Sequence, residues 1–172
     1  SRETPFQLPD STKVGGLKTT KCGDNRYFNN IFVGGVEENQ RSKSGLGIYE
    51  NAELPMYVDG NIYLNGSTKF INETNLFELD YNPNIQIQEK EDEIYLSMPF
   101  DKSIFKMKNK TITSALLGKA QIPNLPFENP DGSPFTIDKD YLGNIRNKKN
   151  PTAGPFEKPG KGEVILKVWE KE

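Results

Sequence analysis

The chain has 172 residues, 34% of them apolar, and its 22 basic and 24 acidic residues leave a net charge of -2. This balance gives no electrostatic reason to expect a nucleic acid or an anionic membrane as partner, and no apolar stretch approaches the roughly 20 residues of a membrane span. The absence of histidine excludes Ser-His-Asp and Cys-His catalysis, so any acid–base chemistry depends on Asp, Glu, Lys or Tyr. A neutral substrate such as a sugar fits this composition better.

The first 20 residues contain Pro5, Pro9, Gly15 and Gly16 and show little periodicity. We expect an extended lead-in that packs against another part of the protein. Cys22 follows it and, as the single cysteine, cannot form an internal disulfide.

A repeated phrase comes next, since NNIFVGG at residues 29–35 returns as GNIYLNG at residues 60–66, an offset of 31 residues. A short apolar strand that opens with Asn and closes with Gly once per coil is typical of a parallel β-helix, in which stacked Asn side chains satisfy the backbone at the corners. The polar, Gly-containing connection at residues 34–45 is expected to form a turn or a mobile loop.

Beyond Ser67 the pattern becomes a strict alternation of apolar residues. The alternating stretches lie on either side of the acidic turn 89–93, and this arrangement predicts an antiparallel hairpin over residues 85–98. A domain boundary near residues 67–75 would separate terminal β-helix coils in residues 1–70 from an antiparallel, loop-rich region in residues 71–172.

Thr113 followed by SALLG predicts one short helix, with Thr113 as N-cap and Gly118 as terminator. Most of the prolines lie in residues 122–159, where we expect irregular loops with short strands. A last strand is expected at 164–169. The fold class is therefore all-β: the last coils of a right-handed parallel β-helix, followed by a small antiparallel region with Pro-rich loops.

Two carboxylates could carry chemistry, since Asp24 stands at the head of the first phrase and Glu50 just before the second. Adjacent coils lie about 4.8 Å apart, close to the separation of about 5 Å that a retaining glycosidase needs between its two carboxyl groups. In the alternative interpretation Asp24 caps a turn and Glu50 is an ordinary surface residue. Asp59 is a third candidate carboxylate, although Asp59-Gly60 is also a strong turn signal.

Four residues are candidates for substrate binding: Arg26, Tyr27, Tyr49 and Asp59. Arg26 and Tyr27 could orient a sugar hydroxyl or hold Asp24 ionised through a charge-assisted bond. Tyr49 could stack on a sugar ring, although aromatic residues at such positions also build cores.

No cofactor or metal is expected. Asp80, Asn82 and Asn84 resemble the first ligands of a calcium loop, but Ile85 stands where an EF-hand needs Gly. An EF-hand is therefore rejected, and a looser calcium site remains an alternative.

Three phrases, at residues 22–35, 53–66 and 137–157, together resemble the C-terminal part of bacterial right-handed parallel β-helix proteins. The most similar group is secreted glycoside hydrolases resembling family 120 β-xylosidases. The resemblance implies a retaining glycosidase with Asp24 as nucleophile and Glu50 as acid/base, a carbohydrate substrate, and a secreted or periplasmic location. Such enzymes are several times longer, so upstream coils of the same enzyme or a second chain would complete the substrate cleft.

Two other functions remain open. The chain could be a non-catalytic β-domain that caps the solenoid or holds a glycan through exposed Tyr side chains and Trp169. It could also be a polysaccharide lyase, but for that function the repeat region offers only Arg26 and the weak calcium pattern.

Overall fold

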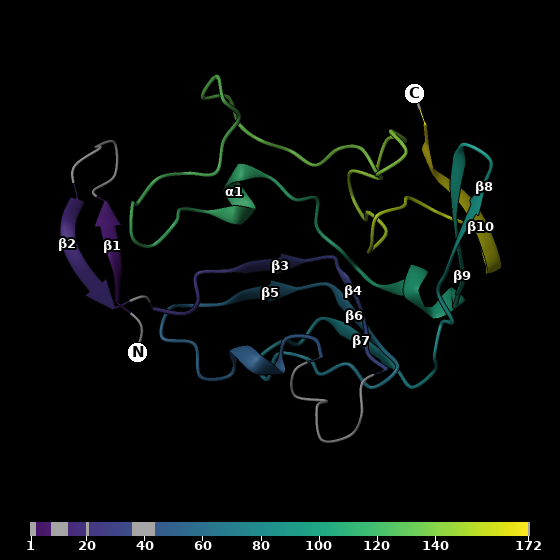
Figure 1. Ribbon diagram of the computed structural model, residues 1–172, viewed down its shortest axis with the longest axis horizontal. Helices are drawn as coiled ribbons and strands as arrows, with labels where there is room; N and C mark the ends of the chain where they lie inside the picture. The colour runs from purple at the N-terminus through teal and green to yellow at the C-terminus, as the bar shows by residue number, and fades with distance from the viewer. Residues whose placement is uncertain (1–2, 8–13, 20, 36–43, 172) are drawn as a thin grey trace.

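A computed structural model describes residues 3–7, 14–19, 21–35 and 44–171 of the chain. This part consists almost entirely of strands and loops, which confirms the expected all-β class (Figure 1). The lead-in forms an antiparallel pair, β1 (Glu3–Gln7) with β2 (Val14–Thr19), at one end of the molecule. Within the described ranges no helix is long and apolar enough to cross a membrane.

The two repeat phrases form neighbouring strands of parallel sheets. β3 (Arg26–Phe28) pairs with β5 (Tyr57–Asp59), and β4 (Ile31–Val33) pairs with β6 (Asn61–Leu64). Ile31 lies opposite Ile62, which is the offset of 31 residues that the phrases predict.

A third parallel strand, β7 (Leu76–Leu79), pairs with β6 and lies beyond the two phrases. This strand has no signature in the sequence, because no Asn-apolar-Gly phrase marks it. The parallel part therefore continues past residue 70, and the expected boundary near that residue stays a prediction.

Polar side chains stack where the chain turns between these strands. The backbone N–H and Nδ2 of Asn30 donate to Asn61 Oδ1 at 2.8 and 3.0 Å, which confirms the predicted stacking of asparagines. In the next layer Glu73 takes the place of an asparagine, and its Oε1 accepts from the N–H and Nδ2 of Asn61 at 3.0 and 2.9 Å. Its Oε2 accepts from the Tyr63 hydroxyl at 2.5 Å.

The antiparallel sheet contains three strands in the order β10, β9, β8. Its strands β8 and β9 pair antiparallel and confirm the predicted hairpin. They are β8 (Gln86–Lys90) and β9 (Glu93–Phe100). β10 (Gly162–Glu170) contains the predicted last strand and returns to pair with β9.

Three short helices complete the described elements: η2 (Gly47–Tyr49), η3 (Lys102–Lys106) and α1 (Ser114–Leu117). The helix α1 is the one that the sequence predicts. Thr113 Oγ1 accepts from Leu116 N–H at 3.2 Å, and Gly118 adopts a φ of 69°. Most of the expected loop at 34–45, residues 36–43, lies outside the described residues.

The larger hydrophobic core joins the parallel and antiparallel parts. Alternate side chains of β6 point in opposite directions, so Ile62 and Leu64 enter this core while Tyr63 enters a smaller one with Leu46 and Phe70. The larger core continues through residues of β9, η3 and the C-terminal loops, namely Met98, Phe100, Ile104, Met107, Ala153 and Phe156.

The polar residues Asn75, Asp59 and Asn29 hold the chain between η3 and α1 against the corner of the stack. Asn75 Nδ2 donates to Lys108 O at 3.1 Å, and Asn29 Nδ2 donates to Lys110 O at 2.9 Å. Lys110 also forms an ion pair with Asp59 at 3.0 Å. The chain thus crosses successive layers and brings the Pro-rich segment beside β3 (Figure 1).

We expect Glu73→Gln to raise the stability of the protein more at neutral than at acidic pH. Burial raises the pKa of Glu73 above its ordinary 4.5, although bonds from Tyr63 and Asn61 oppose the shift, so the folded state holds the proton more tightly than the unfolded chain. That stabilisation is complete below the ordinary pKa and is lost as pH rises through the folded-state pKa. Urea unfolding of both proteins at about pH 4 and about pH 7 measures the difference.

Glu73→Ala serves as the contrasting variant. It leaves the donors of Asn61 and the Tyr63 hydroxyl without their acceptor, so we expect a loss of about 3 kcal/mol in unfolding free energy. Equal stability of the Gln and Ala variants would contradict a structural role for these bonds.

Candidate functional site

Asp24 lies in a tight turn immediately before β3, with its backbone in the left-handed region at a φ of 59°. Its N–H donates to Pro55 O at 2.7 Å, which places the turn over the next layer. Carboxylate Oδ1 accepts from Arg26 Nη1 at 2.7 Å, and Oδ2 accepts from the backbone N–H of Gln121 at 2.8 Å. The side chain is only 15% exposed, so Asp24 is held in one orientation.

Arg26 is the residue that holds this turn. Its guanidinium lies between the rings of Tyr57 and Phe127, at 4.4 and 4.5 Å from the ring centroids. Besides Asp24, it donates through Nε to Leu117 O at 2.7 Å and through Nη2 to Lys119 O at 2.6 Å. The expected charge-assisted bond to Asp24 is thus present, and the remaining donors of Arg26 bind the distant segment 117–119.

Glu50 follows η2 and is exposed to solvent. Its carboxylate has no hydrogen bond or ion pair with any described residue. Just beyond it, Leu54 N–H donates to Cys22 O at 2.9 Å, beside the bond from Asp24 to Pro55. The structure therefore brings residues 54 and 55, which follow Glu50 in the chain, against the turn that carries Asp24.

Tyr27 and Tyr49 connect these two segments from the core side. The Tyr27 hydroxyl donates to the Tyr49 hydroxyl at 3.0 Å, and the ring centroids lie 5.7 Å apart. Burial, together with the bond to Tyr49, raises the pKa of Tyr27 to about 12, so its hydroxyl stays protonated at neutral pH. Both rings pack against the smaller core, and the pair fixes η2, next to Glu50, against β3.

Asp59 lies apart from this group, at the end of β5. It is opposite Phe28 in the parallel register, at the end of β3 that is farther from Asp24 along the chain. Its carboxylate accepts from Asn75 Nδ2 at 2.8 Å and pairs with Lys110. The expected turn is present, since Gly60 has a φ of 78°.

Gln121 is part of the site and was not predicted. Besides its backbone bond to Asp24, its Nε2 donates to the Tyr57 hydroxyl at 3.0 Å. It is 97 residues from Asp24 in the sequence. Only the dense prolines around it hinted at an irregular segment, and nothing indicated which part of the fold that segment would cover.

The described residues contain no group of three or more Cys, Asp or Glu side chains arranged to hold a metal ion. In the segment 80–84, whose residues resemble the first ligands of a calcium loop, Asn82 Oδ1 accepts from the backbone N–H of Asn84 at 2.8 Å, as in an ordinary Asx turn.

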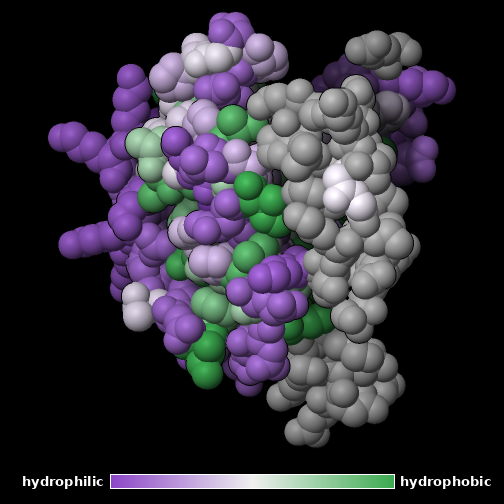
Figure 2. Space-filling view, turned by 90° about the vertical axis from the view of Figure 1, so that its left-hand side faces the viewer, coloured by the Kyte–Doolittle hydropathy of each residue, from purple (hydrophilic) through white to green (hydrophobic). Residues whose placement is uncertain are grey.

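The end of the molecule at which β3 and β5 begin has a mixed surface. Figure 2 shows apolar residues there as small areas scattered among polar ones, on the part of this face that is coloured. A polar, hydroxyl-rich ligand is compatible with such a surface.

Comparison with solved structures finds one chain of the same fold. A structure of XylC in complex with xylose is similar with a TM-score of 0.82 and 28% sequence identity, and the match covers 98% of this chain. It covers 30% of the XylC chain, so the present chain spans less than a third of that protein. No protein-family model and no curated protein sequence matches the chain.

We expect Arg26→Lys to release the segment that Arg26 holds. Lysine cannot reproduce the planar set of donors, so the carbonyls of Leu117 and Lys119 lose their partners at a cost of about 2 kcal/mol in unfolding free energy. Hydrogen exchange should become faster at the Gln121 amide. The matched control is Arg146→Lys, which should loosen residues 139–157 instead. Unchanged protection at Gln121 would contradict the assigned role of Arg26.

Proposed function

We propose that this chain is part of a retaining glycoside hydrolase of the β-xylosidase type, with Asp24 as nucleophile and Glu50 as acid/base. The observation that carries the proposal is the carboxylate of Asp24, which is fixed at both oxygens. The turn that carries it contacts residues 54 and 55, and the exposed Glu50 precedes these residues in the chain. The likeness to XylC, a protein solved with xylose bound, supports a carbohydrate as ligand.

The proposed reaction has two steps. Asp24 attacks the anomeric carbon while protonated Glu50 gives its proton to the glycosidic oxygen, so the bond from carbon to that oxygen breaks and a glycosyl ester forms on Asp24. Glu50, now a carboxylate, then takes a proton from water as the water oxygen attacks the same carbon. The sugar leaves with its configuration retained, and Asp24 and Glu50 return to their starting states.

The surroundings of Asp24 support the role of a nucleophile. Arg26 and the Gln121 N–H each use one acceptor position of the carboxylate, which offers about four such positions in total. The remaining lone pairs are available to carbon, and the two bonds hold the group at one angle. Arg26 also balances the negative charge of Asp24 before the substrate arrives.

Tyr27 and Tyr49 support the position of Glu50, the proposed acid/base. Their hydroxyl bond holds the end of η2 in place, and Glu50 is the next residue along the chain. In this proposal they position Glu50 rather than stack on the sugar, and Asp59 binds the chain at the corner of the stack rather than the substrate.

We further propose that the parallel strands belong to a right-handed β-helix whose other coils, or a second chain, complete the substrate cleft. The stacked side chains of Asn30, Asn61 and Glu73 support such a coil arrangement. A plant-type polysaccharide or xyloside is the proposed substrate, and the protein is proposed to act in the periplasm or outside the cell.

A non-catalytic role in glycan binding is the second candidate. It is favoured by Trp169 and Tyr141, which are 50% and 61% exposed near the end of the antiparallel sheet. Aromatic rings of this kind bind sugar faces without any need for the two carboxylates.

Substitution of the two carboxylates distinguishes these roles. In the full protein, we expect Asp24→Asn to lower kcat/KM on an aryl β-xyloside by on the order of 10⁴-fold or more, because the nucleophile is removed. Glu50→Gln should lower it by about 10²–10⁴-fold, and least for substrates whose leaving group needs no proton. Glu53→Gln, an exposed carboxylate three residues away, is the matched control and should keep the native rate. Full activity of Asp24→Asn would remove the catalytic assignment.

A further inference from the structure

Gln121 and Tyr57 form a polar pair beside the carboxylate of Asp24. The backbone N–H of Gln121 donates to Asp24 Oδ2 at 2.8 Å, and its side-chain Nε2 donates to the Tyr57 hydroxyl at 3.0 Å. Tyr57 lies opposite Arg26 in the register of β3 and β5, and Arg26 binds the other oxygen of Asp24. Gln121 thus connects the proposed nucleophile to the phenol of Tyr57.

Both members of this pair are held by contacts other than the bond between them. The guanidinium of Arg26 lies 4.4 Å from the centroid of the Tyr57 ring, which fixes the position of that ring. The backbone around Gln121 is fixed by a tight turn, since Ala120 N–H donates to Leu125 O at 2.9 Å. Groups that are fixed in advance lose less conformational entropy when they bind a ligand.

The pair keeps hydrogen-bonding capacity that the described residues do not use. Gln121 is exposed, Tyr57 is half-buried, and the bond between them lies at the surface, where a ligand can reach it. While Gln121 Nε2 donates to the phenol oxygen, Gln121 Oε1 remains an acceptor and the phenol proton remains a donor. Neither group has a partner among the described residues. A hydroxyl group of a ligand is both donor and acceptor, so it fits both groups of the pair.

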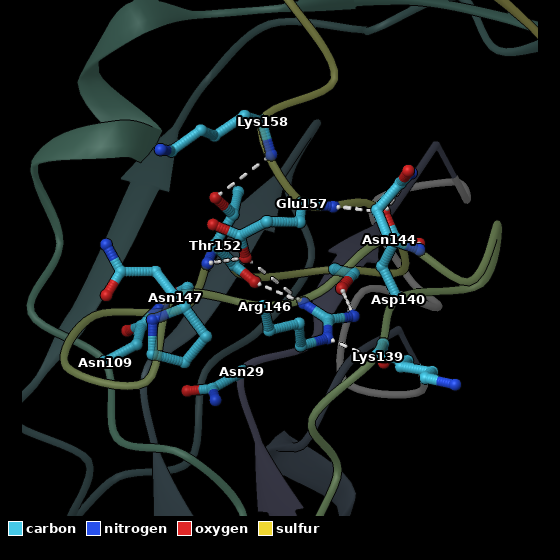
Figure 3. A network of polar contacts seen from close by, with 12 residues as sticks. Asn29, Asn109, Lys139, Asp140, Asn144, Arg146, Asn147, Thr152, Glu157 and Lys158 are labelled. Atoms are coloured by element: carbon cyan, nitrogen blue, oxygen red, sulfur yellow. Dashed lines mark hydrogen bonds and ion pairs between the residues drawn. The ribbon is translucent and has the colours of Figure 1, made fainter.

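A polar cluster around Asp140, in the same Pro-rich segment, has a purely structural arrangement. Asp140 Oδ2 accepts from Asn144 Nδ2 at 3.1 Å and from Glu157 N–H at 2.8 Å (Figure 3). Its Oδ1 accepts from the N–H groups of Leu142 and Asn144 at 2.9 and 2.8 Å. Both oxygens of this carboxylate are satisfied inside the protein, whereas the polar pair beside Asp24 has a donor and an acceptor left for a ligand.

We propose that Gln121 and Tyr57 bind the hydroxyl group at C2 of the sugar, so that the substrate is a glycoside with a free hydroxyl at that carbon. This inference rests on the proposed attack of Asp24 on the anomeric carbon, because C2 is bonded to that carbon. Its other ring neighbour is the ring oxygen, which has no proton to donate to Gln121. Gln121 Oε1 accepts from the C2 hydroxyl, and the Tyr57 hydroxyl donates to it. Hydrogen bonds to this hydroxyl strengthen in the transition state of glycoside hydrolysis, so the pair contributes to the rate.

An aryl β-xyloside and its 2-deoxy analogue, compared in the full protein, test this assignment. In the native protein we expect kcat/KM to be about 10²-fold or more lower for the 2-deoxy substrate, because it offers the pair no hydroxyl. Gln121→Ala removes the amide but keeps the backbone N–H that binds Asp24, and Tyr57→Phe keeps the ring that contacts Arg26. Each variant should lower kcat/KM for the xyloside by about tenfold or more and leave the value for the 2-deoxy substrate nearly unchanged.

Asn144→Ala is the matched control, since it removes an exposed side-chain amide from the same Pro-rich segment. It should leave the ratio of the two kcat/KM values unchanged. Equal losses on both substrates in Gln121→Ala and Tyr57→Phe would show a structural role and overturn the assignment, while the hydrolase itself would stand. Hydrolysis of neither substrate by the native protein, or full activity of Asp24→Asn, would instead reject the hydrolase and the C2 subsite with it.

Discussion

The parallel part of this protein depends on one column of buried polar contacts, from Asn30 through Asn61 to Glu73. Where strands turn at a corner, their backbone groups leave the sheet ladder and need other partners. The side chain of each layer supplies the acceptor for the layer before it, as Asn61 does for Asn30 and Glu73 does for Asn61. The carboxylate of Glu73 accepts hydrogen bonds from two residues, because Oε1 accepts from Asn61 and Oε2 accepts from the Tyr63 hydroxyl. This column fixes the register, and the register places Asp24 beside Pro55.

Prolines impose a different constraint on the rest of the chain. Each proline lacks an N–H, so a Pro-rich segment has more carbonyl acceptors than backbone donors. Arginine can supply the missing donors, since its guanidinium has five N–H groups and no acceptor. Arg26 binds the carbonyls of Leu117 and Lys119, and Arg146 binds those of Lys139, Thr152 and Gly154. Arg26 therefore attaches the irregular segment to the stack, and Arg146 joins parts of that segment to one another, where regular strands would use a ladder.

The sequence predicts those parts of the fold that have a local signature. Three features could be predicted because each depends on residue types at fixed spacing. They are the repeat phrases around Asn30 and Asn61, the hairpin of β8 and β9, and the helix cap at Thr113. The strand β7 lacks the phrase because Leu76 stands opposite Asn61 in the register, and Glu73, which precedes the strand, supplies the acceptor instead. The contact between Asp24 and Gln121 could not be predicted, because the donor is a backbone N–H that every residue except proline carries.

The two candidate carboxylates differ in their burial and in their hydrogen bonds. Asp24 is tied at both oxygens and is 15% exposed, whereas Glu50 is exposed and has no partner among the described residues. A nucleophile gains from a fixed position, since attack requires one angle of approach to carbon. An acid/base group must exchange protons with both the leaving group and water, so it needs access more than restraint. The physical difference between the two environments therefore matches the proposed division of roles, and it was not visible from their spacing of 26 residues in the sequence.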